Sequence, residues 1–476
     1  MGLVKKIKFS NLSKEKTTRF DLPFIHNMDK AYISYYTYHD LFDVIEYTKL
    51  DITLLDNIIY AEIGDIAKTG EVNPVQLSFD NRHELNENYF KKIEKGDIIK
   101  PLKDDILLSK IRPYLNKIVL IKTQNIFYTK AMIQIRPKIN SKLFYYLLRS
   151  TFLNLIIAVS RQGKGYPTLK EDDLKSIRFN KPYIDKIILN ETILVTKIES
   201  REEEIKNLKI QRIDSLKIIS DVFSKEFNID LEEVKKLDNI KQFNLKLKYT
   251  ILKNDLLRTS FKWHKLEIIQ SYMHKDIKCI KKLSKFITST KNGWSPQSSE
   301  VEGGTPVLGQ EHILKNGQIS LSASKFTTLT RNNIENFYIK QNNFFVSRGN
   351  TVELVALAGL VTDNIEDDIL YPDLYIKIDF DEKYINKQYM AYLFNSFFGR
   401  IYFKHVAKGK NQTMVKVSSK ELYDFHVPLP NKTIQQEIVT KIQTQLNSQK
   451  EIDKQIENKQ GEISKIIEDC IKDDLV

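Results

Sequence analysis

The sequence predicts an α+β protein in which one mixed α/β domain and one long helix each occur twice. The tetrapeptide Val-Thr-Lys-Ile stands at residues 195–198 and again at 439–442, and each copy opens a long amphipathic helical pattern. A short Pro-bearing strand precedes each copy, at 177–182 and 425–430. The chain has 476 residues, more than one hydrophobic core normally supports. These observations predict two similar domains separated by two long antiparallel helices.

Other features recur at a nearly constant offset. Tyr146-Leu147 and Gly163 have counterparts 246 residues later, and Leu174 and Pro182 have counterparts 248 residues later. Together with Val-Thr-Lys-Ile, these ordered matches indicate an internal duplication. The match covers the later part of each half. The early stretches 26–90 and 261–330 barely resemble each other, which is typical of two related modules that recognise different things.

The local patterns predict short strands followed by a helix in both halves. Apolar runs of strand length, separated by turn residues, occur at 98–101, 105–109, 118–121, 132–135, 343–348 and 374–378. Helices are expected over 141–160, with Ser141 as N-cap, and over 386–405. Gly-rich loops end both helices, because glycine and proline forbid helix continuation there.

The domain boundaries follow from these patterns. We expect a first domain at 1–185, with a polar arm over its first 25 residues, and a first long helix at 186–224. A charged join and a second domain would occupy 225–432, and a second long helix 433–476. Apolar residues along the two long helices are expected to pack the helices together: Val195, Ile198, Ile205, Val439, Ile442 and Leu446.

Charge and cysteine content narrow the class of protein. The formal net charge is +13 and the pI about 9.2, an excess that favours a polyanionic partner, although a generally Lys-rich composition would also produce it. The two cysteines, Cys279 and Cys470, are far apart and predict neither a disulfide framework nor a Cys-based zinc site. No signal-peptide pattern is present and the longest apolar run, 143–159, is interrupted by polar residues, so we expect a cytoplasmic protein.

A search for catalytic motifs finds little. The sequence has no phosphate-binding loop, no Asn/Asp-Pro-Pro-aromatic motif of an amino-methyltransferase, and no His-x-x-x-His or Gly-x-Ser-x-Gly motif. One loose pattern, Pro372-Asp373 followed by Asp381 and Lys383, is compatible with a metal-dependent nuclease, in which two carboxylates hold Mg²⁺. The pattern arises easily in so charged a chain. We therefore expect a non-catalytic protein that binds no metal and no cofactor itself.

Basic loops at equivalent places in the two halves are the better candidates. Glycine lets a backbone approach a phosphate, Lys or Arg neutralises it, and Arg and Asn can pair with base edges. The alternative is a solvated turn whose Arg neutralises a nearby carboxylate. The DNA-binding candidates are Lys110, Arg112, Arg161 and Lys164 in the first half, and Lys291, Arg348, Asn350, Lys408, Lys410 and Asn411 in the second.

Taken together, these features resemble the DNA-specificity (S) subunits of type I restriction–modification enzymes. The likeness is carried by the duplicated order, by Lys110-Ile-Arg-Pro and Ser347-Arg-Gly-Asn, by the Tyr-Leu helices, by the Gly-Lys loops and by the Pro strand before each long helix. It covers nearly the whole chain, most clearly 96–220 and 340–470. The N-terminal extension and the long join at 224–260 depart from it.

The resemblance implies that the two domains are target-recognition domains, each reading half of a bipartite site in double-stranded DNA. The helices would set the gap between the half-sites and dock two modification (methyltransferase) subunits. Restriction subunits would join indirectly. S-adenosylmethionine, Mg²⁺ and ATP would be bound by those partners and not by this chain. The role would be phage defence.

Three alternatives stay open at this point. The chain could serve another methyltransferase or defence system, could be a stand-alone nuclease that uses Asp373, Asp381 and Lys383, or could be a coiled-coil scaffold without DNA. The target sequence, the gap length, the partner-binding faces of the helices and the exact boundaries are not readable from these residues.

Overall fold

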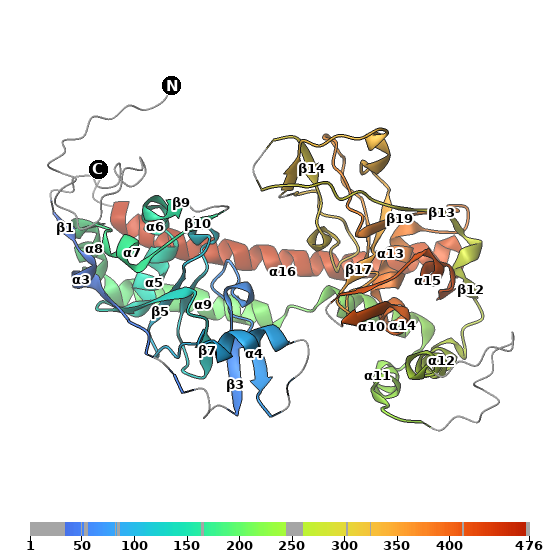
Figure 1. Ribbon diagram of the computed structural model, residues 1–476, viewed down its shortest axis with the longest axis horizontal. Helices are drawn as coiled ribbons and strands as arrows, with labels where there is room; N and C mark the ends of the chain where they lie inside the picture. The colour runs from blue at the N-terminus through green and yellow to red at the C-terminus, as the bar shows by residue number, and fades with distance from the viewer. Residues whose placement is uncertain are drawn as a thin grey trace. The chain divides into compact units, whose positions relative to one another are not determined.

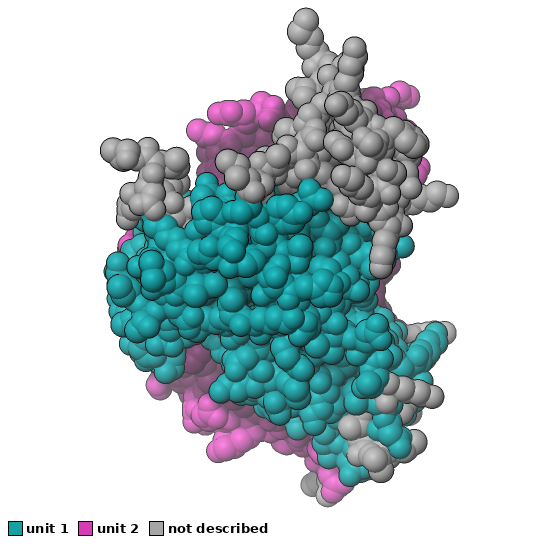
Figure 2. Space-filling model, turned by 90° about the vertical axis from the view of Figure 1, so that its left-hand side faces the viewer, with its two compact units in different colours: residues 1–210, 454–476 teal, residues 211–453 magenta. Residues whose placement is uncertain are grey.

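The computed structural model describes residues 34–48, 50–51, 56–80, 82, 86–162, 166–243, 260–300, 303–323, 325–411 and 414–472. The chain divides into two compact units, coloured separately in Figure 2. Unit 1 consists of Met1–Ile210 and Lys454–Val476, and unit 2 of Gln211–Asp453. The polar arm expected at residues 1–25 lies outside the described residues.

A four-stranded antiparallel sheet forms the core of unit 1 (Figure 1). Its order is β2 (Phe42–Val44), β8 (Met132–Pro137), β5 (Ile106–Ser109) and β6 (Ile118–Leu120). All four residues of β5 are buried, so this strand is a continuous apolar run with both faces covered. Helices α5 (Ser141–Arg149) and α6 (Leu153–Val159) follow β8 in the chain, and α5 packs on β6 and β8. A second sheet joins β4 (Val75–Ser78), β3 (Asn57–Ala61) and β7 (Ile126–Tyr128), and α4 (Glu87–Glu94) follows β4 in the chain.

Unit 2 repeats this arrangement with the same antiparallel strand order. Its sheet runs β13 (Ile287–Asn292), β19 (Tyr375–Phe380), β16 (Phe344–Ser347) and β18 (Ala358–Leu360). Helices α13 (Lys387–Asn395) and α14 (Phe397–Val406) follow β19 as α5 and α6 follow β8. A smaller sheet pairs β14 (Thr305–Val307) with β15 (Lys325–Thr327). The predicted α+β class with two similar mixed domains is confirmed.

Similar small elements follow the four-stranded sheet and its helices in both units. After its helices, unit 1 has the hairpin β9 (Arg161–Gln162) and β10 (Pro167–Thr168), the short helix α7 (Glu171–Lys175) and strand β11 (Phe179–Asn180), which pairs with β1 (Tyr35–Tyr36). Unit 2 has the hairpin β20 (Lys408–Asn411) and β21 (Met414–Lys416), with β17 (Gly349–Asn350) beside it. Helix α15 (Ser419–Tyr423) follows, and then β22 (His426–Pro428), which pairs with β12 (Ile280–Lys282).

Equivalent asparagines start the helices that cover the sheets. The N-cap of α5 is Asn140, whose side chain accepts hydrogen bonds from the backbone N–H groups of the next turn, and the N-cap of α13 is Asn386, which does the same. The expected N-cap Ser141 is therefore wrong by one residue. Each predicted single helix is in fact two helices. Ser396 ends α13 and its side chain caps α14, because a Ser hydroxyl offers the next N–H a local acceptor.

The early parts of the two halves also correspond, contrary to expectation. Ile66-Ala-Lys-Thr-Gly-Glu-Val72 and Ile313-Leu-Lys-Asn-Gly-Gln-Ile319 lie 247 residues apart. Both segments form a turn closed by an antiparallel bridge between their first and last residues. Gly70 and Gly317 both have positive φ, +82° and +79°. The repeat was hidden because only three of these seven positions keep an identical residue, whereas backbone hydrogen bonds preserve the shape.

The first long helix differs from its prediction over 186–224. The segment contains three helices, α8 (Lys181–Leu189), α9 (Glu191–Ile210) and α10 (Ser215–Phe227). The break before α10 has a local cause, because the Asp214 side chain caps that helix by accepting from the N–H of Leu216 at 2.9 Å. The second long helix, α16 (Lys432–Lys472), is continuous.

Two expected strands are also shorter than predicted. The run 98–101 forms no continuous strand, and Ile99 makes only an isolated antiparallel bridge to Tyr128. The strand expected at 177–182 ends at Asn180, because Asn180 caps α8 and Pro182 occupies the first turn of that helix, where its fixed φ is compatible with helix.

The segment between α10 and β12, which the sequence predicted as a charged join, contributes to the core of unit 2. It contains α11 (Leu231–Asn239) and α12 (Phe261–His274). Together with α10 they bury Ile219, Phe223 and Ile269 in the same hydrophobic cluster as α13 and the start of α16. The segment before residue 261 is therefore part of unit 2, which extends from Gln211 to Asp453.

No single helix among the described residues has the length and apolar character needed to cross a membrane. Only α5 and α6 taken as a pair, bent by 63° at the break between them, meet the criteria of length and composition.

Candidate nucleic-acid interface

The end of the central strand β5 places Lys110 beside the β9–β10 hairpin of unit 1. The backbone N–H of Lys110 donates to the carbonyl of Ala131 at 3.0 Å, and the N–H of Leu169 donates to the Lys110 carbonyl at 2.8 Å. The first bond continues the sheet and the second ties the residue that follows the hairpin to the strand end. Lys110 is thereby fixed at the junction of sheet, hairpin and α7.

Arg348 occupies the same junction in unit 2, at the end of β16. Its backbone N–H donates to the carbonyl of Leu374 at 2.6 Å, and its carbonyl accepts from the N–H of Val417 at 2.9 Å. These bonds match those of Lys110 one for one. The predicted correspondence of the two strand ends therefore extends to their backbone hydrogen bonds.

The side chains at these junctions face carboxylates. Lys110 Nζ lies 2.7 Å from Glu171 Oε1 and 5.0 Å from the centre of the Tyr47 ring. Burial is the largest single influence on Glu171 and opposes its ionisation, but the hydrogen bond from Lys110, a backbone hydrogen bond and the charges of Lys110 and Lys175 together lower the pKa of that carboxyl. Arg348 Nη1 lies 3.9 Å from Asp373 Oδ2.

The hairpin cations also neutralise carboxylates. Arg161 Nε lies 2.9 Å from both carboxylate oxygens of Asp173, which is 2% exposed, and Lys408 Nζ lies 2.8 Å from Glu421 Oε1. Each carboxylate belongs to the first turn of the following short helix and accepts the backbone N–H of its N-cap residue. Arg161 is therefore anchored, whereas the Lys408 side chain stays 76% exposed. The alternative of a turn cation that neutralises a neighbouring acid holds for both.

Arg112 and Asn350 lie two residues beyond the junctions. Arg112 adopts a left-handed backbone with φ 51°, donates its N–H to the Pro167 carbonyl at 2.9 Å, and carries its guanidinium 5.4 Å from the Tyr166 ring centre. Asn350 belongs to β17, and its Oδ1 accepts the N–H of Thr351 at 2.8 Å.

The remaining DNA-binding candidates lie apart from these junctions or outside the described atoms. Lys164 is not among the described residues, and Lys410 and Asn411 belong to β20 with side chains beyond the described part. Lys291 lies on β13, with its Nζ 4.9 Å from the centre of the Phe337 ring. Arg331 also faces the Phe337 ring. The sequence did not mark Arg331 as a candidate, because it stands in a polar stretch without apolar periodicity.

The expected helix-packing residues are buried, each within its own unit. Ile198 and Ile205 of α9 are 0% and 8% exposed, while Val195 is half-buried. Val439, Ile442 and Leu446 belong to the unit 2 core.

Ion pairs give the direction of helix packing in each unit. In unit 1, Lys459 pairs with Glu204 at 2.9 Å and Glu462 with Arg201 at 2.6 Å, so the end of α16 runs antiparallel to α9. In unit 2, Lys441 pairs with Glu226 and Asp453 lies 2.7 Å from Arg212, so the start of α16 runs antiparallel to α10.

The nuclease pattern does not form a metal site. Asp373 and Asp381 stand at opposite ends of the six-residue strand β19, roughly 25 Å of extended chain apart. Asp373 is bound to Ser295, and Asp381 caps its own turn by accepting the N–H of Lys383 at 3.1 Å. Among the described residues, no group of three or more His, Cys, Asp or Glu side chains is placed to hold a metal ion.

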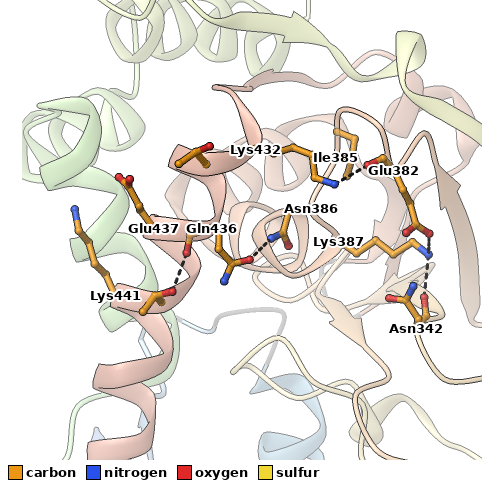
Figure 3. A pocket seen from close by; sticks show the side chains of 11 residues that line it. Asn342, Glu382, Ile385, Asn386, Lys387, Lys432, Gln436, Glu437 and Lys441 are labelled. Carbon is orange, nitrogen blue, oxygen red and sulfur yellow. Dashed lines mark hydrogen bonds and ion pairs between the residues drawn. The ribbon is translucent and has the colours of Figure 1, made fainter.

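A groove of about 940 Å³ opens in unit 2 at the start of α16 (Figure 3). Its cations are already engaged: Lys387 pairs with Glu382 at 2.6 Å, and Lys432 donates to the Glu382 carbonyl at 2.8 Å. Asn386 Nδ2 donates to Gln436 Oε1 at 2.8 Å across the groove. The groove is thus a polar joint between α13 and α16, with its polar groups satisfied by one another. A second groove, of about 1070 Å³, lies in unit 1 among α5, α9 and the end of α16, where Lys142 bridges Glu199 and Glu202.

No protein-family model matches the chain, and no curated protein matches it. Solved structures do match. One belongs to a study of complex assembly and conformational transition of the type I R-M system, with 12% identity, TM-score 0.37, and coverage of 93% of this chain and 98% of that one. The HsdS subunit from Thermoanaerobacter tengcongensis matches with 12% identity, TM-score 0.28, and coverage of 93% and 97%. The S subunit of a type I restriction–modification system from M. genitalium matches with 13% identity, TM-score 0.34, and coverage of 92% and 95%. The structural neighbours of this chain thus include specificity subunits of type I restriction–modification systems.

Proposed function

We propose that this chain is the non-catalytic DNA-specificity subunit of a type I restriction–modification complex, and that each unit reads one half of a bipartite site. The observation that carries the proposal is the shared position of Lys110 and Arg348. Two units hold a cation by the same backbone hydrogen bonds at the same strand end. The side chains around those cations differ, as expected of two readers of different sequences.

The chemistry of the junctions suits duplex DNA. Lys110, Arg112, Arg348 and Asn350 combine phosphate-neutralising charge with donors that can pair with base edges. The net charge of +13 adds a long-range attraction to a polyanion. Phosphate contacts would dominate the affinity, so binding should weaken steeply as salt rises.

The helices supply the second half of the proposal. Helix α16 packs antiparallel on α9 in unit 1 and on α10 in unit 2, and apolar residues are buried along it in both units. In our proposal this helical frame sets the spacing between half-sites and docks two methyltransferase subunits. S-adenosylmethionine, Mg²⁺ and ATP are bound by those partners and by the restriction subunits.

Mapping of modified bases in the host genome tests the proposal directly. A split motif with a fixed gap, whose modification disappears when this gene is deleted and returns with the full-length chain, is the expected result. Loss of the gene without any change in modification would refute it. If the split motif appears but no restriction subunit is required for defence, the chain serves another methyltransferase system.

The nuclease alternative is tested with the purified chain. Mg²⁺-dependent cleavage of duplex DNA that is lost in Asp373→Ala would favour it. We expect no cleavage, because Asp373 and Asp381 lie at opposite ends of β19.

A further inference from the structure

A cluster of cations and aromatic rings lies at the end of β13 and on nearby loops of unit 2, and of its members only Lys291 was a candidate from the sequence. It consists of Lys291, Trp294, Arg331 and Phe337, called here the aromatic cluster. The Arg331 guanidinium carbon lies 4.6 Å from the centre of the Phe337 ring and 5.4 Å from that of Trp294. Lys291 Nζ lies 4.9 Å from the Phe337 ring centre. Phe337 is thus contacted by both cations.

The rings are held in place by the loop backbone. Trp294 donates its backbone N–H to the Tyr371 carbonyl at 3.0 Å. A Cβ on Gly293 would lie only 2.1 Å from the Pro372 carbonyl oxygen, so this approach requires glycine. Trp294 is therefore tied by its backbone to Tyr371, whose own N–H donates to the Phe337 carbonyl at 3.1 Å.

The aromatic cluster adjoins the Arg348 junction. Ser295, next to Trp294, donates its hydroxyl to Asp373 Oδ1 at 2.5 Å, and the backbone N–H of Asp373 donates back to Ser295 Oγ at 3.0 Å. Asp373 also faces Arg348 Nη1 at 3.9 Å. A chain of contacts in unit 2 therefore links Arg348, through Asp373 and Ser295, to Trp294 of the aromatic cluster.

The cations of the aromatic cluster differ from four of the other candidates in what they face. Lys110, Arg161, Arg348 and Lys408 all lie within 4.0 Å of a carboxylate. Within the described part of the chain, neither Lys291 nor Arg331 has such a neighbour; both face ring surfaces. A cation paired with a carboxylate must give up that pair to bind DNA, whereas a cation on a ring keeps its full charge.

Arg331 also keeps its donors. A guanidinium held over aromatic faces is oriented by its flat surface, and its N–H groups remain available at its edge for a planar pair of acceptors. Arg331 is exposed, while Trp294 and Phe337 are partly buried. The rings therefore reduce the freedom of the side chain without occupying its hydrogen-bonding edge.

We propose, on the basis of the function proposed above, that Arg331 is a base-reading residue of unit 2, oriented by Trp294 and Phe337, and that Lys291 beside it contacts a phosphate. The bidentate fork of Arg suits the two acceptors of guanine in the major groove. The point charge of Lys suits a backbone phosphate.

Two arginines of unit 1 also lie near rings, but in other settings. Arg82 lies 4.9 Å from the Phe90 ring centre and is paired with Glu94 at 2.6 Å, and Arg112 lies 5.4 Å from the centre of the Tyr166 ring. Because Arg331 belongs to unit 2, the proposal predicts an effect on one half-site only.

The test is selection from a randomised duplex DNA library with the full-length chain in complex with its methyltransferase subunits. The wild-type complex should yield a split consensus. Arg331→Ala should lower the preference for one base pair of one half-site by about tenfold to hundredfold and leave the other half-site unchanged. Arg331→Lys, which keeps the charge, should lose the same preference. Thermal unfolding of both variants should match that of the wild type.

Lys291→Ala should weaken binding to all duplexes alike and reduce the salt dependence, with the consensus unchanged. The matched control is Lys383→Ala, because Lys383 Nζ also lies over a ring, 5.3 Å from the centre of Tyr384, but beyond the other end of β19. That variant should bind like the wild type.

The outcomes separate the two levels of the proposal. If the wild-type complex binds no DNA with sequence preference, the proposed function fails. If the wild type gives a split consensus and Arg331→Ala gives the same one, base reading by Arg331 is refuted. A uniform loss of affinity in Arg331→Ala with an unchanged consensus would assign Arg331 to a phosphate and refute base reading as well.

Discussion

Lys110 and Arg348 are held by the same pair of backbone hydrogen bonds in the two units. Each donates its N–H to the neighbouring strand or the turn before it, and each accepts from the residue that follows the hairpin. Because backbone bonds do not depend on side-chain identity, this geometry is the same in both units although the side chains differ. The two junctions are thus the same place in two modules.

We predict that Lys110→Ala and Arg348→Ala alter different half-sites of the DNA target. Each variant removes a cation from one unit only, so each should relax or weaken recognition of one half-site, by about tenfold. Binding competition with duplexes mutated in either half measures this. Lys138→Ala is the control, because Lys138 also pairs with a carboxylate, Asp43, at 2.8 Å in unit 1. Equal effects of Lys110→Ala and Arg348→Ala on both halves would contradict the prediction.

Arg161 and Lys408 should differ in their contribution to stability, although they occupy equivalent places. Arg161→Ala leaves the buried carboxylate of Asp173 without its cation and should cost about 2 kcal/mol of unfolding free energy. Lys408→Ala should cost less than about 1 kcal/mol, because the Lys408 side chain is 76% exposed. Chemical denaturation of the two variants gives the comparison. A larger loss in Lys408→Ala would show that exposure does not govern these pairs.

The turn glycines offer a test with an internal control. Gly70 has φ +82°, and a Cβ there would lie 2.3 Å from the Tyr145 hydroxyl and 2.6 Å from the Ile118 carbonyl oxygen. We expect Gly70→Ala to cost about 3 kcal/mol. Gly96 has the same φ with nothing within 4 Å, so Gly96→Ala should cost only about 1 kcal/mol for the left-handed backbone. Similar melting temperatures of the two variants would contradict the packing argument.

His274 should make unit 2 sensitive to mild acid. Burial, helped by the nearby charge of His426, lowers the pKa of His274 to about 4 from its ordinary value of 6.5. Between these values the unfolded chain binds a proton that the folded chain does not, so stability present above about pH 6.5 is lost as pH falls toward 4. The loss is about 2–3 kcal/mol.

The variant His274→Phe tests the cause of this acid sensitivity. It keeps an aromatic ring next to Phe398, which now stacks with His274 at 6.3 Å between ring centres. Unfolding free energies measured from pH 7 to pH 4 should fall less steeply than in the wild type. An unchanged slope would assign the acid sensitivity to other groups.

The order of strands and helices followed from the sequence, because apolar periodicity and turn residues act locally. The runs at 105–109, 118–121, 132–135 and 374–378 all lie in the predicted strands β5, β6, β8 and β19. The breaks within the predicted helices could not be predicted from periodicity, because each depends on a single capping side chain, such as Asp214 before α10 or Ser396 before α14. Ile66–Val72 and Ile313–Ile319 were not recognised as a repeat, because shape is kept there by backbone bonds and two glycines.

The sequence by itself determined that one arrangement of strands and helices occurs twice, that helical segments follow each copy, and which loops carry positive charge. Only the tertiary structure decided which of those charges are neutralised. Glu171 reaches Lys110 across 61 residues of chain, and Arg331 meets Trp294 across 37. Periodicity records which face of an element is apolar, but the partner of a charged side chain comes from another element, and folding alone brings the two together.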